Sequence, residues 1–145
     1  MKKLLTVVIL LGCIFCASAR DSYTRDKSVL PSAARIMVEK NFQAEVNHIK
    51  IDKEYGKVSE YDVILNDGTE ISFDPQGRWT DIEVQRNGSV PGALIPASIS
   101  SYIKQTHNNA SIIGIEKKKT GYEVELSDGV ELIFNQAGKF IRYDK

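Results

Sequence analysis

Two histidines, His48 and His107, are the side chains of this 145-residue chain best suited to act as a general base near neutral pH. His107 ends an apolar stripe of helical spacing, at the place that Phe42 holds in an earlier stripe, so we interpret it as a packing residue at a helix end. His48 falls on the polar side of a predicted strand, where we expect it to be exposed. A general base needs a positioned partner, and the sequence indicates none. We therefore expect no catalytic residue and no enzymatic activity.

Metal binding has equally little support. Residues 66–68 (Asn-Asp-Gly) and 74–77 (Asp-Pro-Gln-Gly) place carboxylates in loops, but they lack the alternating carboxylates and the closing glutamate of a calcium loop. Hairpin turns explain both segments. We predict no metal site and no cofactor.

Alternating strand patterns indicate one surface suited to binding. If Tyr61, Val63 and Leu65 face a helix, the residues between them face outward, and the segment 122–126 repeats this arrangement. The outward face is acidic with isolated apolar side chains, which suits a basic partner. The candidate partner-binding residues are Ile64, Trp79, Glu123, Glu125, Glu131 and Ile133. Which way Trp79 faces is left open, and the alternative is an ordinary solvated face with one core tryptophan.

These candidates lie within an internal repeat. The segment 61–73 (YDVILNDGTEISF) recurs at 122–134 (YEVELSDGVELIF), an offset of 61 residues (122 − 61), and Gly77 recurs as Gly138. A repeat of this length indicates two copies of one supersecondary unit.

Each copy begins with an apolar stripe of helical spacing, next to Pro31 in the first and Pro96 in the second. Short alternating runs follow, separated by Asp-Gly pairs that are typical of tight hairpins. The pattern predicts an α+β fold of two tandem repeats, each with one helix packed on a four-stranded antiparallel meander, and with the two sheets side by side. The predicted segments are a signal peptide (1–19), a flexible N-terminal segment (20–28), repeat 1 (29–86), a connector (87–94) and repeat 2 (95–145).

The first residues have the pattern of an export signal. Lys2 and Lys3 precede an apolar run, and residues 17–19 (Ala-Ser-Ala) form a signal-peptidase pattern. The alternative is a lipid anchor on Cys13, which follows Leu-Leu-Gly. We expect a periplasmic or secreted protein without an integral membrane segment after signal removal. Both cysteines lie inside the signal, so no disulfide is expected.

The remaining chain has 17 basic residues (19 − 2) and 19 acidic ones. The small negative charge lacks the basic footprint of a nucleic-acid-binding protein, so no nucleic-acid partner is expected.

The repeated motifs resemble those of the β-lactamase-inhibitor-like, PepSY-like family of exported bacterial proteins. In the first copy they are Leu30-Pro31, Tyr61-x-Val63-x-Leu65, Asp67-Gly68-x-Glu70 and Phe73-Asp74-x-x-Gly77, and their counterparts begin at Ile95, Tyr122, Asp128 and Phe134. The resemblance implies tandem helix-plus-sheet units, a cell-envelope location and a non-catalytic, protein-binding role. The namesake inhibitors use disulfides and an acidic hairpin loop, whereas this chain has no cysteine beyond Cys16 and only a short loop at 66–68.

Two hypotheses follow from the sequence. The first is an exported binding module, inhibitor-like in layout, whose open sheet face engages an unknown protein or peptide of basic character. The second is a periplasmic small-ligand sensor or carrier with a site between the two repeats.

Overall fold

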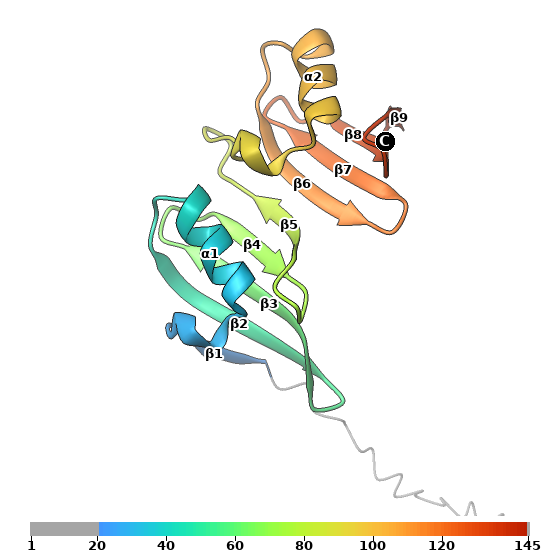
Figure 1. Ribbon diagram of the computed structural model, residues 1–145. Coiled ribbons are helices and arrows are strands. Elements are labelled where there is room, and N and C mark those ends of the chain that lie inside the picture. Colours follow the sequence, from blue (N-terminus) through green and yellow to red (C-terminus); the bar gives the residue numbers. More distant parts are fainter. Residues whose placement is uncertain (1–20, 145) are drawn as a thin grey trace, which may run out of the picture.

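The computed structural model describes residues 21–144 (Figure 1). The predicted signal peptide and the alternative lipid anchor on Cys13 lie outside the described residues. The elements are β1 (Ser22–Thr24), α1 (Ser32–Asn41), β2 (Val46–Glu54), β3 (Lys57–Leu65), β4 (Glu70–Phe73), β5 (Trp79–Glu83), α2 (Ala97–Thr106), β6 (Ile112–Lys118), β7 (Gly121–Leu126), β8 (Glu131–Asn135) and β9 (Phe140–Tyr143). Short 3₁₀ helices, Lys27–Val29 and Gly92–Leu94, precede the two α helices.

All strands belong to one antiparallel sheet whose spatial order follows the chain from β1 to β9. The α+β class is as predicted, and the strands form one nine-stranded sheet. Strands β5 and β6 form the seam, where Ile82 lies opposite Ile115 and the Val84 amide donates to the Ile113 carbonyl at 2.8 Å. Pairing the two inner strands hides edges that would otherwise stay exposed.

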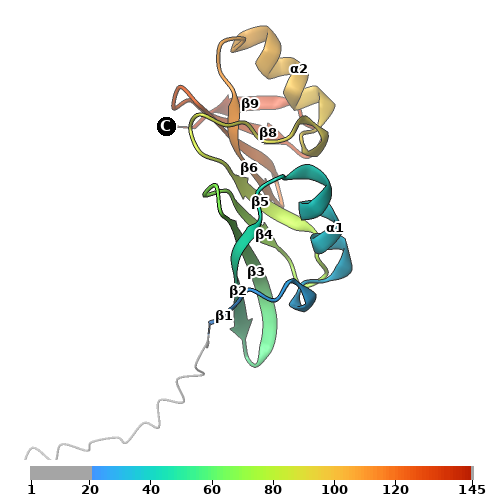
Figure 2. The same ribbon diagram turned by 90° about the vertical axis from the view of Figure 1, so that its left-hand side faces the viewer.

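Both helices lie on the same side of the sheet, and the opposite side stays open (Figures 1 and 2). Pro31 and Pro96 immediately precede α1 and α2, where a fixed φ is tolerated. The helices bury Ala34 and Val38, and Ile99 and Ile103, against the sheet. Every buried apolar strand residue but Ile113 joins the same core: Ile49, Val63, Leu65, Ile71, Phe73, Ile82, Ile112, Ile115, Val124, Leu126, Leu132 and Phe134.

The predicted Asp-Gly turns are confirmed. The carboxylate of Asp67 accepts from the Thr69 amide at 2.9 Å, and Asp128 accepts from the Val130 amide at 3.1 Å. Gly68 has φ +84° and Gly129 has φ +89°, backbone conformations that residues other than glycine rarely adopt.

Part of the segment 20–28, expected to be flexible, has regular structure. Ser22–Thr24 forms strand β1, which pairs with β2 through Tyr23 opposite Lys50 and Thr24 opposite Ile49. Such a short, polar strand has no apolar alternation for a pattern to detect. Backbone pairing holds it against β2, together with the ring contact of Tyr23 with His48.

Candidate functional site

The open face carries a row of directly opposed side chains that crosses the sheet from β2 to β9. Its members, in spatial order, are Lys50, Asp62, Ser72, Asp81, Glu116, Glu123, Ile133 and Arg142. Basic residues stand near the two ends of this row and acidic residues in its middle. The negative charge of the open face is therefore concentrated at the centre of the sheet.

A second row lies beside the first and adds further carboxylates. Glu70 is opposite Glu83, and Glu125 is opposite Glu131. Between them stands Gly114, whose missing side chain helps leave a depression of about 160 Å³ across the β5–β6 seam. We call the carboxylates around it the acidic centre: Glu70, Asp81, Glu83, Glu116, Glu123, Glu125 and Glu131.

Most of the acidic centre has no cationic partner. Lys118 contacts Glu116 at 3.4 Å and also binds Glu123. The remaining members make no salt bridge to any residue between 21 and 144. Like charges directly opposite on neighbouring strands are destabilising. The fold therefore tolerates an arrangement that favours a cation from outside.

The pKa values of two of these carboxylates are raised, in part by the same repulsion. Burial, followed by the nearby charges of Glu83 and Glu116, raises the pKa of Asp81 from 3.8 to about 6. Burial, followed by Glu70 and Glu125, also raises the pKa of Glu83. Both shifts have the sign expected for carboxylates that lack a counter-charge.

The structure places five of the predicted binding residues on the open face. Ile64 is opposite Glu70, Ile133 is opposite Glu123, and both isoleucines are half-buried. Glu123, Glu125 and Glu131 belong to the acidic centre itself. An apolar side chain therefore lies on each side of the acidic centre, one in β3 and one in β8.

Trp79 lies apart from the other candidates. It is opposite the fully buried Phe73 and packs against the core, so it belongs to the face that the helices cover. A bulge at Thr80 shifts the alternation of β5, which is why its facing could not be predicted. The Lys117 ammonium sits 3.4 Å from the centre of the indole ring. This arrangement matches the alternative of a core tryptophan.

Sequence reasoning missed Asp81, Glu83 and Glu116 as site residues. The alternation around the buried Ile82 and Ile115 could have placed these acids on the open face. It could not have brought them together, because the seam joins strands that are far apart in the sequence.

One group of carboxylates approaches the spacing of cation ligands. One ligand oxygen each of Glu123, Glu131 and Asp144 lie within 4.8 Å of one another. Glu123 is bound by Lys118, and Asp144 accepts from Arg142 Nη1 at 2.7 Å. A cation at this place would have to compete with both basic side chains.

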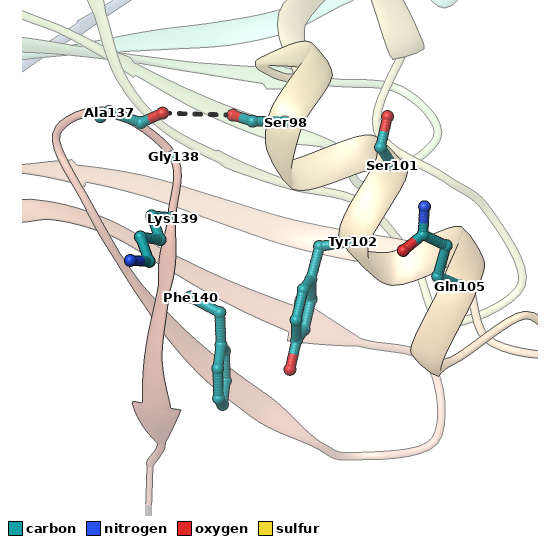
Figure 3. A pocket seen from close by; sticks show the side chains of 8 residues that line it. All are labelled: Ser98, Ser101, Tyr102, Gln105, Ala137, Gly138, Lys139 and Phe140. Carbon is teal, nitrogen blue, oxygen red and sulfur yellow. Dashed lines mark hydrogen bonds between the residues drawn. The ribbon is translucent and has the colours of Figure 1, made fainter.

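A second hollow lies between α2 and the β8–β9 hairpin (Figure 3). It measures about 500 Å³, and the rings of Tyr102 and Phe140 stack at 4.7 Å with an angle of 11° in its lining. Ser98 Oγ donates to the Ala137 carbonyl at 3.3 Å, close to Gly138. The two aromatic rings face each other, so the hollow is the surface of a packed helix–hairpin contact.

Neither histidine lines the acidic depression. His107 ends α2 and stacks edge-on against Tyr143, with His107 Nε2 3.3 Å from the Tyr143 hydroxyl. His48 Nδ1 lies 2.8 Å from Asn47 Oδ1. The packing role predicted for His107 matches these contacts.

Comparison with known proteins places this geometry in a family. Residues 59–142 match the family described as "Putative beta-lactamase-inhibitor-like, PepSY-like". No match was found among curated proteins. None of the helices between residues 21 and 144 has the length and apolar character needed to cross a membrane.

Three solved structures share the fold. A protein of Bacteroides vulgatus described as "a putative periplasmic protein of unknown function" is 41% identical, with a TM-score of 0.81, covering 87% of this chain and 100% of its own. A second B. vulgatus periplasmic protein is 29% identical (TM-score 0.79; 88% and 99% covered). A Bacteroides thetaiotaomicron protein described as "a putative calcium-regulated periplasmic protein" is also 29% identical (TM-score 0.79; 86% and 97% covered).

The match to the family model extends over more than half of the chain, and the solved relatives are described as periplasmic. The protein is periplasmic or secreted, and it belongs to the β-lactamase-inhibitor-like, PepSY-like family.

Proposed function

We propose that this protein is a non-catalytic binding module that takes a basic protein or peptide segment on the open face of its sheet. The observation that carries the proposal is the acidic centre, where the opposed pairs Glu70–Glu83 and Glu125–Glu131 make no salt bridge to any described residue. A lysine or arginine side chain in the depression would relieve their repulsion.

The raised pKa of Asp81 supports the same proposal. A group whose charged form is disfavoured in the free protein gains most when a cation arrives, because the cation favours that charged form. Charge-assisted hydrogen bonds from ammonium or guanidinium groups are also stronger than neutral ones. Ile64 and Ile133 would supply apolar contacts on either side.

The proposal includes the two-repeat organisation. In it, each half is one copy of a helix-plus-strands unit, and the binding surface forms where the last strand of the first unit meets the first strand of the second. The depression then draws its residues from both units, so neither unit alone would hold it.

Crosslinking in the periplasm tests this proposal. A photoreactive amino acid at Ile133 should capture a partner that is released at high salt, since exposed charge interactions are screened. The same amino acid at Ile36, which is 61% exposed on α1, serves as the matched control. Equal capture at both positions, or capture indifferent to Glu123→Lys and Glu125→Lys, would contradict the proposal.

A second candidate is a calcium ion bound at the same face, which would make the module a small-ligand sensor. Two observations favour it: the clustered carboxylates of Glu123, Glu131 and Asp144, and a relative described as calcium-regulated. Carboxylate oxygens are the ligands that calcium prefers.

Thermal unfolding separates the two candidates. A ligand that binds only the folded state raises the melting temperature by mass action. Calcium should raise it more than magnesium or sodium at equal ionic strength, and Glu131→Gln should abolish the difference. Equal shifts for all three ions would remove the calcium candidate and leave the peptide-binding proposal standing.

A further inference from the structure

Strand β9 ends the sheet, and no described strand pairs with its outer edge. At this edge Ile141 is 54% exposed and Tyr143 is 47% exposed. Unpaired backbone groups next to exposed apolar side chains are a template for a further strand. The question is which strand fits.

An inner strand shows how such an edge is used. Strand β5 pairs with β4 through Ile82 opposite Ile71, and β9 pairs with β8 through Tyr143 opposite Leu132. Both strands contain a register shift at the same place, directly after the aromatic residue that is opposite Phe73 or Phe134. Tyr143 therefore occupies in β9 the place that Ile82 occupies in β5, where β6 adds to the sheet.

The backbone of β9 is oriented to accept a strand at Tyr143. The Asp144 amide donates inward, to the Glu131 carbonyl at 2.9 Å. Because backbone groups point alternately to the two sides of a strand, the amide and carbonyl of Tyr143 point outward. The edge of β5 is used in this way: the Val84 amide points outward and donates to the Ile113 carbonyl of β6.

We propose that the outer edge of β9 pairs with β9 of a second copy of this chain, antiparallel, with Tyr143 opposite Tyr143 on a twofold axis. In this register Arg142 lies opposite Asp144 of the second copy, and Asp144 lies opposite its Arg142. Opposite charges and aromatic pairs directly across two strands are stabilising. The edge is thus complementary to itself, as a twofold interface requires.

Charge complementarity selects the second copy as the occupant. Arg142 and Asp144 already pair within one chain at 2.7 Å, and Arg142 Nη1 also donates to the Tyr143 carbonyl at 3.1 Å. When two edges meet, Arg142 would give up both contacts for the second copy's Asp144, and the Tyr143 carbonyl would turn to the backbone of the second copy. Pairing of β9 with β1 of another copy would be head-to-tail and would continue into an open filament. Strand β1 has only three residues and offers no counterpart to the Arg142–Asp144 pair.

Sedimentation equilibrium of the exported protein tests the proposal. The unmodified protein should dimerise reversibly. Arg142→Asp and Asp144→Arg should each weaken the dimer about tenfold or more, because like charges then face each other twice across the axis. An equimolar mixture of the two variants should associate as well as the unmodified protein, since each pair then joins Asp to Arg.

The mixture separates the interface from effects within one chain, because mixing does not repair the pair inside either variant. Arg25→Asp makes the same charge change beside β1 and should leave the dimer unchanged. Amide exchange of Tyr143 should slow as concentration rises, whereas that of Thr24 should not. A protein that stays monomeric at every concentration would overturn the proposal. So would an unassociated mixture, or an open-ended assembly sensitive to Arg25→Asp.

Discussion

Strands β5 and β9 occupy corresponding positions in the two halves of the molecule but have different surroundings. Ile82 in β5 is fully buried, whereas Tyr143 in β9 is about half exposed. On the open face, Asp81 in β5 adjoins other carboxylates, whereas Arg142 in β9 pairs with Asp144. The same strand geometry thus gives an internal seam lined by clustered acids in one half and a charge-paired edge in the other. The proposed binding surface lies where the halves meet.

The substitution with the largest expected effect on stability, and one that only the second half should feel, is at Gly121. Its φ is +148°, and a Cβ there would come within 1.9 Å of the Phe134 carbonyl oxygen. The corresponding residue of the first half, 61 positions earlier, is Glu60, so only the second half requires glycine here. Gly121→Ala should lower the free energy of unfolding by about 3 kcal/mol or more. Chemical denaturation measures this loss.

Gly129→Ala provides the control, because Gly129 has φ +89° but no heavy atom within 4 Å of a Cβ. It should cost only about 1 kcal/mol, the strain of the backbone alone. Equal losses for the two variants would show that the close approach to β8 does not matter.

Substitutions at Ile82 and Tyr143 test whether β5 and β9 are packed differently. Ile82→Ala leaves a cavity in the core at the seam and should cost about 3 kcal/mol. Tyr143→Ala removes a half-exposed ring and should cost less than about 1 kcal/mol in the monomer. Urea unfolding at low protein concentration compares the two, and a greater loss for Tyr143→Ala would show that the edge is as well packed as the seam.

The third prediction concerns pH and has the smallest effect. Because the pKa of Asp81 is raised to about 6, the folded state holds this proton more tightly than the unfolded state. The stability contributed by Asp81 is therefore present below about pH 4 and is lost as the pH rises toward 6. Asp81→Asn removes the charge and should stabilise the protein by about 1 kcal/mol near neutral pH, a value reduced for solvent screening.

Well below about pH 4 the same substitution should have little effect, because Asp81 is then neutral in both states. Thermal unfolding measured at low pH and near neutral pH checks both expectations. A variant that stabilises equally at every pH would show that the carboxylate charge is not the cause.

Local patterns predicted the parts of the fold that depend on nearby residues. The alternation of Tyr61, Val63 and Leu65 identified the covered face, since period two is a property of a single strand. The Asp-Gly pairs identified the hairpins, because those turns need a positive φ at glycine.

The parts that depend on distant pairing could not be predicted. Strand β1 is short and polar, and its pairing with β2 has no local pattern that would reveal it. At the seam Asp81 lies opposite Glu116, and no sequence pattern indicates that these two strands pair. The sequence therefore predicted only the members of the acidic centre that lie in β7 and β8. The side of the sheet that Trp79 faces could not be predicted, because a bulge at Thr80 interrupts the alternation. Replacing Trp79 should therefore affect stability rather than binding.

Binding of a lysine-only peptide, measured by titration calorimetry at low and high salt, tests the central claim most directly. The unmodified protein should bind the peptide with an affinity that falls steeply as salt is added. Glu123→Lys with Glu125→Lys should abolish binding, while the same reversal at Glu45 and Glu54, exposed residues outside the acidic centre, should leave most of it. Equal loss in both double variants would contradict the account, because binding would then follow net charge alone.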